Sequence, residues 1–552
     1  MSGNLSRPVV DVRTSATTVL SHRLVACLLV GVAALAFWWA RGDGPIDLRW
    51  DGGAYYLLGT SLERGDGYRI LSEPGNLPSS LHPPLVPAIV ALHQFALQTA
   101  DPVVVGQALR FTLGFCSAAY AMAVFLLLSA SLPLALSVVV TLVGVLQPQY
   151  VYFSDCLYAE GLFGLLTVLF FVVRQWRRDA LGFVLCAVCA VLAYEARTAG
   201  IALLAAWVVD HALRKEYRRA LAAVVVSAVV VTSWNGWIKA VESSPEYRQP
   251  AYAYQTEAWL YFNVSYARNL LTYFNPWRPA LGPLTPSGFV SRVTANLKVL
   301  PQNVGQAVSG WWTPRRLAIP LAALVLCGLL LLARRQPALV AYVALSFAAI
   351  CATPFQKQFV RYLLPLYPFL ALAMFTFLAR VPARVRLRWP ALPQALVAAV
   401  PWAVLAVVVP RATIEALELY ASHRQQVSYV QHGRPISYRL FYYGPEAVDF
   451  DAALDWLDGH AAPGDVLAAG DPQWAHLRTG RRTVLPPFEL DGRKGQRLID
   501  SVPVKYLIES TYPAYLRFTT PLLAANPQAW RQVWRGPNGM VVIHERVGAP
   551  RP

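Results

Sequence analysis

The chain has 552 residues, of which 56% are hydrophobic and only 14% are charged, and its mean hydropathy is +0.40. Soluble domains carry roughly 25% charged residues, so this composition excludes an ordinary soluble protein and indicates a polytopic membrane protein. The net charge of +17 could suggest nucleic acid, but the basic residues lie in short clusters between apolar segments, where they orient a chain in a bilayer. We therefore expect no nucleic-acid partner.

Hydropathy predicts about eleven membrane-spanning helices, since a bilayer core of about 30 Å needs about 20 mostly apolar residues per helix. The first, over residues 22–40, has no small-residue cleavage site, so we expect an anchor rather than a cleaved signal peptide. Residues 84–99 are apolar but short and punctuated by proline, which favours an interfacial or re-entrant helix. The other expected spans are 103–129, 132–148, 157–173, 180–194, 199–213, 220–239, 316–333, 337–352, 359–379 and 390–409.

The basic clusters fix the expected orientation of these spans. Eleven spans place the clusters on one side of the membrane together with the N-terminal segment 1–21, and the positive-inside rule makes that side the cytoplasm. An odd number of spans then puts the region after residue 410 outside. The clusters are Arg174, Arg177 and Arg178; Arg214, Lys215, Arg218 and Arg219; Arg334 and Arg335; and Arg380, Arg384, Arg386 and Arg388.

The first exterior loop contains an acid, paired glycines and paired tyrosines in the stretch RWDGGAYYLLGTSLERGDGY. Asp51 is a candidate general base, with helix capping as the alternative. Gly52 and Gly53 allow the backbone beside it to turn sharply or to approach another segment closely. Tyr55 and Tyr56 suit either an interfacial helix or a wall against which a sugar stacks.

Two further polar groups belong to the exterior loops that precede the second and fourth spans. His82, in SSLHPPLVP, stands before two prolines that force an extended entry, and it is either a ligand-binding or an ordinary turn histidine. Asp155 and Glu160, in YFSDCLYAE, could cap the fourth span and favour its positive end. Alternatively, they orient sugar hydroxyls or, with a phosphate, hold Mg²⁺ or Mn²⁺.

The sequences YEARTAG and FQKQFVRYLLP place two arginines near exterior helix N-termini, where the helix dipole disfavours a cation. We expect an anion to offset that cost at Arg197 and Arg361. A phosphate held by arginine and helix N–H groups is one candidate, and an ion pair with Glu195 or another exterior carboxylate is the alternative. Lys357 is a weaker candidate for the same phosphate, because it also suits a solvated position.

The middle thirds of the expected spans carry almost no ionisable residues, whereas transporters usually need such groups at bilayer depth. The pattern therefore favours a site at the exterior membrane surface over a path through the membrane. The aromatic and proline-rich loop 240–315 is long enough to form interfacial helices that cover such a site.

The region 410–552 has the pattern of a small exterior α/β domain behind a linker at 411–445. DFDAALDWLDGH has helical spacing, DVLAAG and VKYLIES resemble buried strands, and WRGPNGMVVIHER indicates a hairpin turning at Asn538-Gly539. We interpret Asp471, His476 and His544 as ordinary surface or loop residues. The expected role of this domain is acceptor recognition or shielding.

Five short motifs, DGGAYYLLGTSLERGDGY, HPPLVP, SDCLYAEGLF, EARTAGIALL and RYLLPLYPFL, together resemble the GT-C superfamily of integral-membrane glycosyltransferases. The resemblance is to the aminoarabinose transferase and protein O-mannosyltransferase-like group, and its ordered motifs cover about residues 20–410. It implies a GT-C-like catalytic domain over 22–409, a catalytic acid matching Asp51, and a polyprenyl-phosphate sugar as donor. The mannosyltransferases have Glu after the acid, where this chain has Gly52, and the acceptor does not carry over.

The residues themselves lead to a similar function. Nucleotide sugars are cytoplasmic, and the chain has neither a GxGxxG fingerprint nor a P-loop, so an exterior transferase must use a lipid-linked donor. We predict an inverting glycosyltransferase of the inner cell membrane, acting on an exterior glycan, lipid or protein, with Asp51 as base. Arg197 and Arg361, helped by His82 and Lys357, would bind the departing phosphate. The alternatives are a transporter or flippase, a lipid-linked glycan ligase, and a non-catalytic scaffold that binds the cell envelope.

Overall fold

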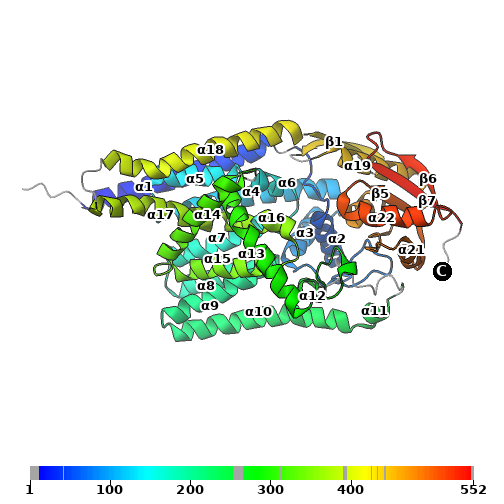
Figure 1. Ribbon diagram of the computed structural model, residues 1–552, viewed down its shortest axis with the longest axis horizontal. Coiled ribbons are helices and arrows are strands. Elements are labelled where there is room, and N and C mark those ends of the chain that lie inside the picture. Colours follow the sequence, from blue (N-terminus) through cyan, green and yellow to red (C-terminus); the bar gives the residue numbers. More distant parts are fainter. Residues whose placement is uncertain are drawn as a thin grey trace, which may run out of the picture.

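The computed structural model describes residues 12–41, 43–250, 252, 265–310, 312–388, 394–423, 425–431, 433–440 and 443–548. A bundle of long helices occupies one end of the molecule, and a domain with a β-sheet occupies the other (Figure 1). Parts of three expected segments, namely 1–11 of the N-terminal segment, 253–264 of the long exterior loop and 390–393 of the last span, lie outside the described residues.

The bundle confirms that the chain is mainly helical and has the apolar helices of a multi-pass membrane protein. Its helices are α1 Val12–Arg41, α4 Pro102–Ser129, α5 Leu134–Val145, α6 Pro148–Asp155, α7 Ala159–Trp176, α8 Ala180–Ala196, α9 Ile201–Leu213, α10 Tyr217–Ser243, α14 Arg315–Leu332, α15 Pro337–Ala352, α16 Phe359–Leu363, α17 Tyr367–Arg388 and α18 Gln394–His423.

Seven described segments are long and apolar enough to cross a membrane, and each coincides with an expected span. They are Ser21–Arg41, Pro102–Ser129, Ala159–Trp176, Tyr217–Ser243, Arg315–Leu332, Gln356–Arg380 and Ala398–Glu418. The other four expected spans coincide with the shorter apolar helices α5, α8, α9 and α15, so a total of about eleven crossings stays a prediction.

Two of the expected cytoplasmic clusters are joined through one buried carboxylate. Asp210, near the end of α9, pairs with Arg174 in the last turn of α7 and with Arg214 just after α9. The opposite end of α7 carries Glu160 in its first turn. An 18-residue helix is about 27 Å long, so this basic cluster and Glu160 lie at opposite ends of a helix long enough to span a bilayer.

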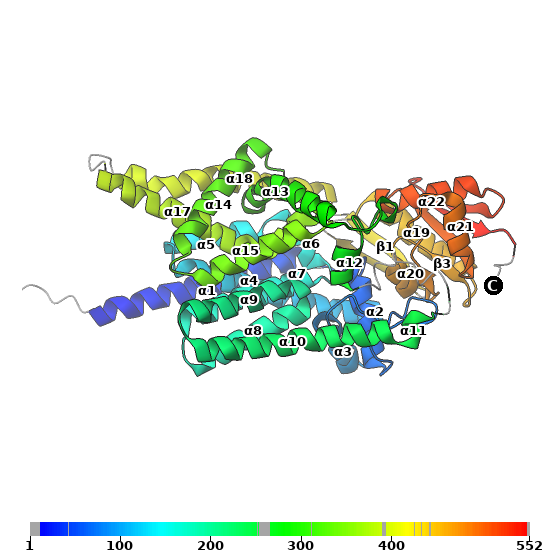
Figure 2. The same cartoon turned by 60° about the horizontal axis from the view of Figure 1, so that its bottom comes forward.

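The segments expected outside the membrane are largely helical. In the first loop, α2 (Asp51–Glu63) and α3 (Leu85–Leu97) lie at the end of the bundle next to the sheet domain (Figures 1 and 2). The long connection contains α11 (Pro245–Arg248), α12 (Tyr266–Thr272) and α13 (Pro286–Ser309). The helix expected within 84–99 is thus present.

The C-terminal region forms an α/β domain with a five-stranded sheet in the order β4-β3-β5-β7-β6. β3 pairs in parallel with β4 and β5, whereas β7 is antiparallel to β5 and β6. The expected strands and the hairpin at Asn538-Gly539 are confirmed. The elements are α19 Pro445–His460, β3 Val466–Ala468, α20 Pro472–Thr479, β4 Thr483–Val484, α21 Gly492–Asp500, β5 Val504–Ser510, α22 Pro513–Ala525, β6 Trp530–Arg535 and β7 Val541–Arg546.

Most of the residues in 411–445, where we expect a linker, are ordered into regular elements. Helix α18 continues to His423, and an antiparallel hairpin follows, made of β1 (Gln425–Gln431) and β2 (Arg434–Leu440). Hydropathy does not predict this continuation, because α18 contains prolines and is followed by polar residues after residue 410.

The loop after α1 and the C-terminal domain share one hydrophobic core. Ile46, Leu48 and Tyr55 belong to the same buried cluster as Tyr438 of the hairpin and Trp474 of α20. Apolar surface removed from water stabilises such a contact by roughly 25 cal/mol per Å². The domain is therefore packed onto the segment that carries Asp51, and this packing positions the site described next.

Candidate active site

A cavity of about 240 Å³ lies where the end of the helical bundle meets the C-terminal domain. One water needs only about 10–15 Å³ measured in this way, so the cavity can admit a much larger group. Its lining comes from five parts of the chain: Trp50, Asp51, Ala54, Leu81 and His82; Tyr152 and Tyr158; Trp277; Gln358 and Arg361; and Gly470, Asp471, Pro472, Gln473, Leu485, Tyr512 and Tyr515.

Asp51 enters this cavity from the first turn of α2. Two glycines behind it allow the helix start to pack tightly on both sides. A Cβ at Gly52 would lie 3.1 Å from the carbonyl oxygen of Asp47, and a Cβ at Gly53 would lie 2.8 Å from the Cβ of Gln473. The close approach expected from the paired glycines is thus confirmed, with α20 of the C-terminal domain on one side.

Three charged side chains connect Asp51 to the interior of the bundle. Arg361 in α16 donates from Nη2 to Oδ2 of Asp51 and from Nε to Oε1 of Glu160. Arg197, between α8 and α9, pairs through Nη1 with the same oxygen of Glu160. Glu160 thereby holds two guanidinium groups side by side, and Asp51 receives one of them.

Exposure is graded along this cluster. The exposed fraction of the side chain falls from 30% at Asp51 to 18% at Arg361 and 1% at Glu160. Asp51 therefore faces the open cavity, while Glu160 forms the buried base of the cluster. The guanidinium carbon of Arg361 also lies 4.7 Å from the ring centroid of Tyr158, a cation–π contact that fixes the plane of the group further.

The surroundings of Asp51 keep it ionised. Burial raises the pKa of Asp51, but the positive charge of Arg361, the hydrogen bond from Arg361 and the charge of Arg197 outweigh burial and hold the pKa below its usual value. His82 lies against Tyr55, with ring centroids 4.8 Å apart. Burial lowers the pKa of His82 to about 4, against the opposing effect of Asp51. At neutral pH the pair is therefore a carboxylate and a neutral imidazole.

Several expected site residues lie outside the cluster. Tyr56 is buried and donates its hydroxyl to the carbonyl of Ala100, 2.9 Å away, so it has a structural contact there. Lys357 is exposed and does not line the cavity. Glu195 is half-buried in the last turn of α8, and among the described ion pairs Arg197 is joined to Glu160 instead.

Asp155 and Glu160 are each paired with arginines in this arrangement. The Oδ1 atom of Asp155 lies 3.1 Å from Arg41 and 3.5 Å from Arg110, while Glu160 is paired with its own two arginines. Each carboxylate is already neutralised by cations, which compete with a metal ion for the same oxygens. Within the described part of the chain, no three His, Cys, Asp or Glu side chains are grouped to hold a metal.

The contribution of the C-terminal domain to the cavity was not predicted. The interpretation of Asp471 as an ordinary surface or loop residue is wrong: its residue is only 6% exposed, and its side chain lines the cavity. Trp50 stacks on Tyr515 with ring planes 10° apart, and Tyr512 lies beside them. In the sequence, the only signal was the pattern DPQW, which marks a helix start at Asp471 and says nothing about where that helix docks.

Solved structures share this fold over nearly the whole chain. The oligosaccharyltransferase of Archaeoglobus fulgidus in the apo form has a TM-score of 0.55 at 12% identity, over 94% of this chain and 74% of that one. AglB from the same organism, in complex with an inhibitory peptide and a dolichol-phosphate, has a TM-score of 0.53 at 12% identity. The match covers 94% of this chain and 74% of that one. ArnT from Cupriavidus metallidurans in the apo state gives 0.50 at 14% identity, over 97% of this chain and 98% of that one.

These likenesses establish the fold, because the identities are far too low to establish more. The chain has the fold of the GT-C membrane glycosyltransferases, as its ordered motifs indicate. No protein-family model matches the chain. No curated protein matches its sequence.

Proposed function

We propose that this protein is a membrane glycosyltransferase that moves a sugar from a polyprenyl-phosphate donor to a hydroxyl of an acceptor outside the cytoplasm. The observation that carries the proposal is the cluster of Asp51, Arg361, Glu160 and Arg197, which opens into a cavity between the bundle and the C-terminal domain. An ionised carboxylate beside two arginines, at the end of apolar helices, matches the needs of a lipid-phosphate leaving group and a hydroxyl nucleophile. The dolichol-phosphate complex of the similarly folded AglB agrees with such a donor.

In the proposed reaction, the acceptor oxygen attacks the anomeric carbon as Asp51 removes its proton. The bond between that carbon and the phosphate oxygen breaks, the anomeric configuration inverts, and the polyprenyl phosphate leaves with the bonding electrons. A general base of this kind typically contributes about 10²- to 10⁴-fold to the rate. A phosphate monoester is a good leaving group, so no separate general acid is required.

Arg361 and Arg197 would bind the donor phosphate. Guanidinium groups have five N–H donors each, and Glu160 accepts only part of this set, so both can hold a phosphate while Glu160 keeps them aligned. A phosphate that replaces Asp51 at Nη2 of Arg361 would also remove the charge that depresses the pKa of Asp51. Donor binding would thus make Asp51 a stronger base when the reaction needs it. His82 is neutral and would act as a hydrogen-bonding group, and Lys357 would attract the phosphate at longer range.

The acceptor would enter beside the C-terminal domain. Trp50 and Tyr512 are 37% and 40% exposed at the cavity, and aromatic rings of this kind bind the apolar faces of sugars. We favour a glycan or glycolipid acceptor over a protein for this reason. The proposed orientation has the N-terminus in the cytoplasm and the C-terminal domain outside.

Reconstitution tests this proposal. The purified protein in liposomes is supplied with radiolabelled polyprenyl-phosphate hexoses and pentoses and with an envelope extract as the acceptor source. We expect transfer of label from one donor class, accompanied by release of polyprenyl phosphate. Movement of intact lipid-linked sugar across the bilayer without cleavage would instead identify a flippase and overturn the proposal.

A further inference from the structure

The segment that precedes Asp51 is held by the C-terminal domain at two successive residues. The buried guanidinium of Arg49 pairs with Asp451 of α19 and lies over the rings of Tyr443 and Trp474, at 5.0 Å and 4.8 Å from their centroids. The backbone N–H of Trp50 donates to Oδ2 of Asp471, 2.7 Å away. Both contacts join residues more than 400 positions apart in the chain.

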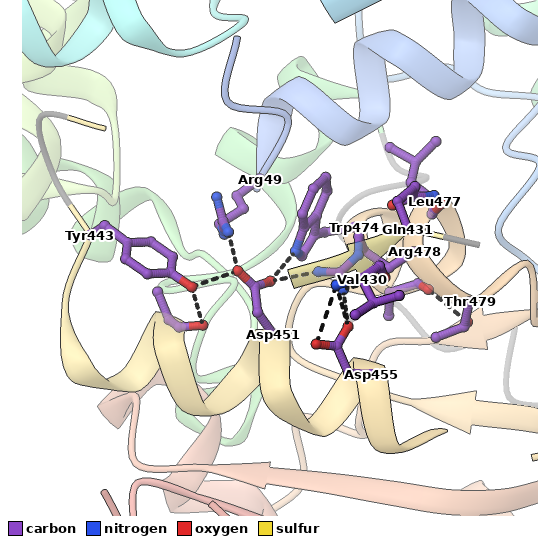
Figure 3. Close-up of polar contacts among 12 residues, drawn as sticks. Arg49, Val430, Gln431, Tyr443, Asp451, Asp455, Trp474, Leu477, Arg478 and Thr479 are labelled. Atoms are coloured by element: carbon purple, nitrogen blue, oxygen red, sulfur yellow. Dashed lines mark hydrogen bonds and ion pairs between the residues drawn. The ribbon is translucent and has the colours of Figure 1, made fainter. Parts of the chain in front are cut away.

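Asp451 is fixed by more than its contact with Arg49 (Figure 3). Its carboxylate also accepts from the Tyr443 hydroxyl at 2.7 Å, from Nε1 of Trp474 at 2.8 Å and from Nη1 of Arg478 at 3.1 Å. Each of these partners would be costly to leave unpaired in a buried site, so the contacts together hold the carboxylate of Asp451 in place. Arg49 is therefore tied to a fixed part of the domain.

Trp50 has a backbone conformation that needs such support. Its φ of 60° and ψ of −126° lie in a region that side-chain-bearing residues rarely adopt, so the backbone is strained there. Trp50 immediately precedes α2 and has no side-chain cap of its own. The direction in which Asp51 leaves the backbone is thus set at a strained residue.

Asp471 has two hydrogen bonds with separate consequences. Its Oδ1 accepts from the N–H of Trp474 at 3.2 Å, which is the ordinary N-cap of α20. Its Oδ2 accepts from Trp50 and serves no helix of its own domain. One buried carboxylate therefore links the start of α20 to the residue that aims Asp51.

We propose that Asp471 is a positioning residue for Asp51, and that the C-terminal domain is thereby part of the catalytic centre rather than only a cover or acceptor-binding module. Its carboxylate stabilises the strained Trp50 peptide, which holds Asp51 toward Arg361 and the cavity. The catalytic role of Asp471 rests on the function proposed above. Its stabilisation of the Trp50 backbone does not depend on that function.

The substitution Asp471→Ser separates the two hydrogen bonds. Serine is a good N-cap, so α20 keeps its start, but its single hydroxyl cannot also reach Trp50. Asp491→Ser is the matched control, because Asp491 caps α21 in the same domain and, among the described residues, accepts from Arg493 and Lys494 of its own helix. If Asp471→Ser does not fold, Asp471→Asn, which keeps the side-chain length, is tested by the same criteria.

The first readout does not depend on activity. Hydrogen exchange followed by mass spectrometry is measured for the peptide covering Trp50 to Gly53. We expect exchange at least tenfold faster in Asp471→Ser and unchanged in Asp491→Ser. Equal protection in both variants would overturn the proposal, whether or not the protein proves to transfer sugars.

The second readout is kinetic. We expect kcat in Asp471→Ser to fall at least tenfold, while its Kd for undecaprenyl phosphate stays within about twofold, because the phosphate ligands are unaffected. Trp50→Gly removes the strain, since glycine adopts this φ freely. In that background Asp471→Ser should cost less than threefold, and fully additive effects would contradict the positioning role.

Discussion

Arg361 donates a hydrogen bond to Asp51, although 310 residues separate them in the chain. This contact joins the first turn of α2 to the start of the apolar segment Gln356–Arg380. Glu160 accepts from Nε of the same guanidinium. The predictions below follow from what each member of this cluster does for its neighbours.

Arg361→Ala should weaken donor use. The change removes the phosphate ligand and leaves Asp51 and Glu160 without their shared cation, so we expect kcat/KM for the donor to fall by about 10²-fold or more. The measurement is steady-state kinetics in liposomes over a range of donor concentrations. Arg434→Ala is the control, because Arg434 forms a surface ion pair with Asp101 and has no part in the proposed reaction. An equal effect of the two changes would argue against the phosphate role.

Glu160→Gln should impair both folding and donor affinity. The amide cannot hold two guanidinium groups as the carboxylate does, and the half-buried Arg197 loses its charged partner. We expect a loss of stability of about 1–3 kcal/mol and a Kd for undecaprenyl phosphate raised about tenfold. Thermal unfolding in detergent and equilibrium binding measure the two effects. Tighter phosphate binding in Glu160→Gln would show that Glu160 competes with the donor instead of aligning its ligands.

The activity should rise with pH through about 7. Burial raises the pKa of Asp471 to about 7, against hydrogen bonds from Trp50 and Trp474 and the charge of Arg49, while Asp47 adds to the increase. The ionised form accepts from both N–H groups, and protonation at lower pH removes one accepting oxygen. Asp51 has a lowered pKa and His82 one of about 4, so neither titrates in this range.

The pH dependence is checked by measuring kcat between pH 5.5 and 8.5. We expect kcat to rise near pH 7 in the wild type and to be independent of pH in Asp471→Ser. His82→Gln should keep the rise of kcat near pH 7, because a neutral imidazole is replaced by another neutral hydrogen-bonding group. If the rise of kcat near pH 7 persists in Asp471→Ser but disappears in His82→Gln, the titrating group is His82 and not Asp471.

Gly53→Ala should separate α2 from the C-terminal domain. The new Cβ would lie 2.8 Å from Gln473 and 3.0 Å from the carbonyl oxygen of Leu48, so one of the packed segments must move. We expect a destabilisation of about 1–3 kcal/mol and faster proteolysis at the domain junction. Gly459→Ala is the control, since a Cβ there meets nothing within 4 Å in a helix. Identical melting temperatures for the two variants would refute tight docking at Gly53.

The sequence was sufficient to predict the helical bundle, because apolar segments of spanning length are a strong physical requirement of a bilayer. The sequence also predicts that Asp51, Glu160, Arg197 and Arg361 lie at one end of the bundle, since the expected number of spans puts their loops on the same side. The ion pair with an exterior carboxylate, one of the two alternatives for the arginines, is present in the structure. Their phosphate role stays a prediction.

The wall supplied by the C-terminal domain could not be predicted in the same way. Asp471 and Trp50 are 421 positions apart, and their contact depends on how α20 packs against α2. Nothing local in either stretch determines that packing. Hydropathy likewise cannot show that α18 continues to His423, because a helix that leaves the membrane becomes polar without ending.

The most direct measurement compares wild-type protein with Asp51→Asn in liposomes that contain the accepted donor and acceptor. Asparagine preserves the size of the side chain but removes the base, so we predict that sugar transfer falls by at least about 10²-fold while undecaprenyl phosphate still binds. Transfer at the wild-type rate by a folded Asp51→Asn protein would contradict the assignment of Asp51 as the base.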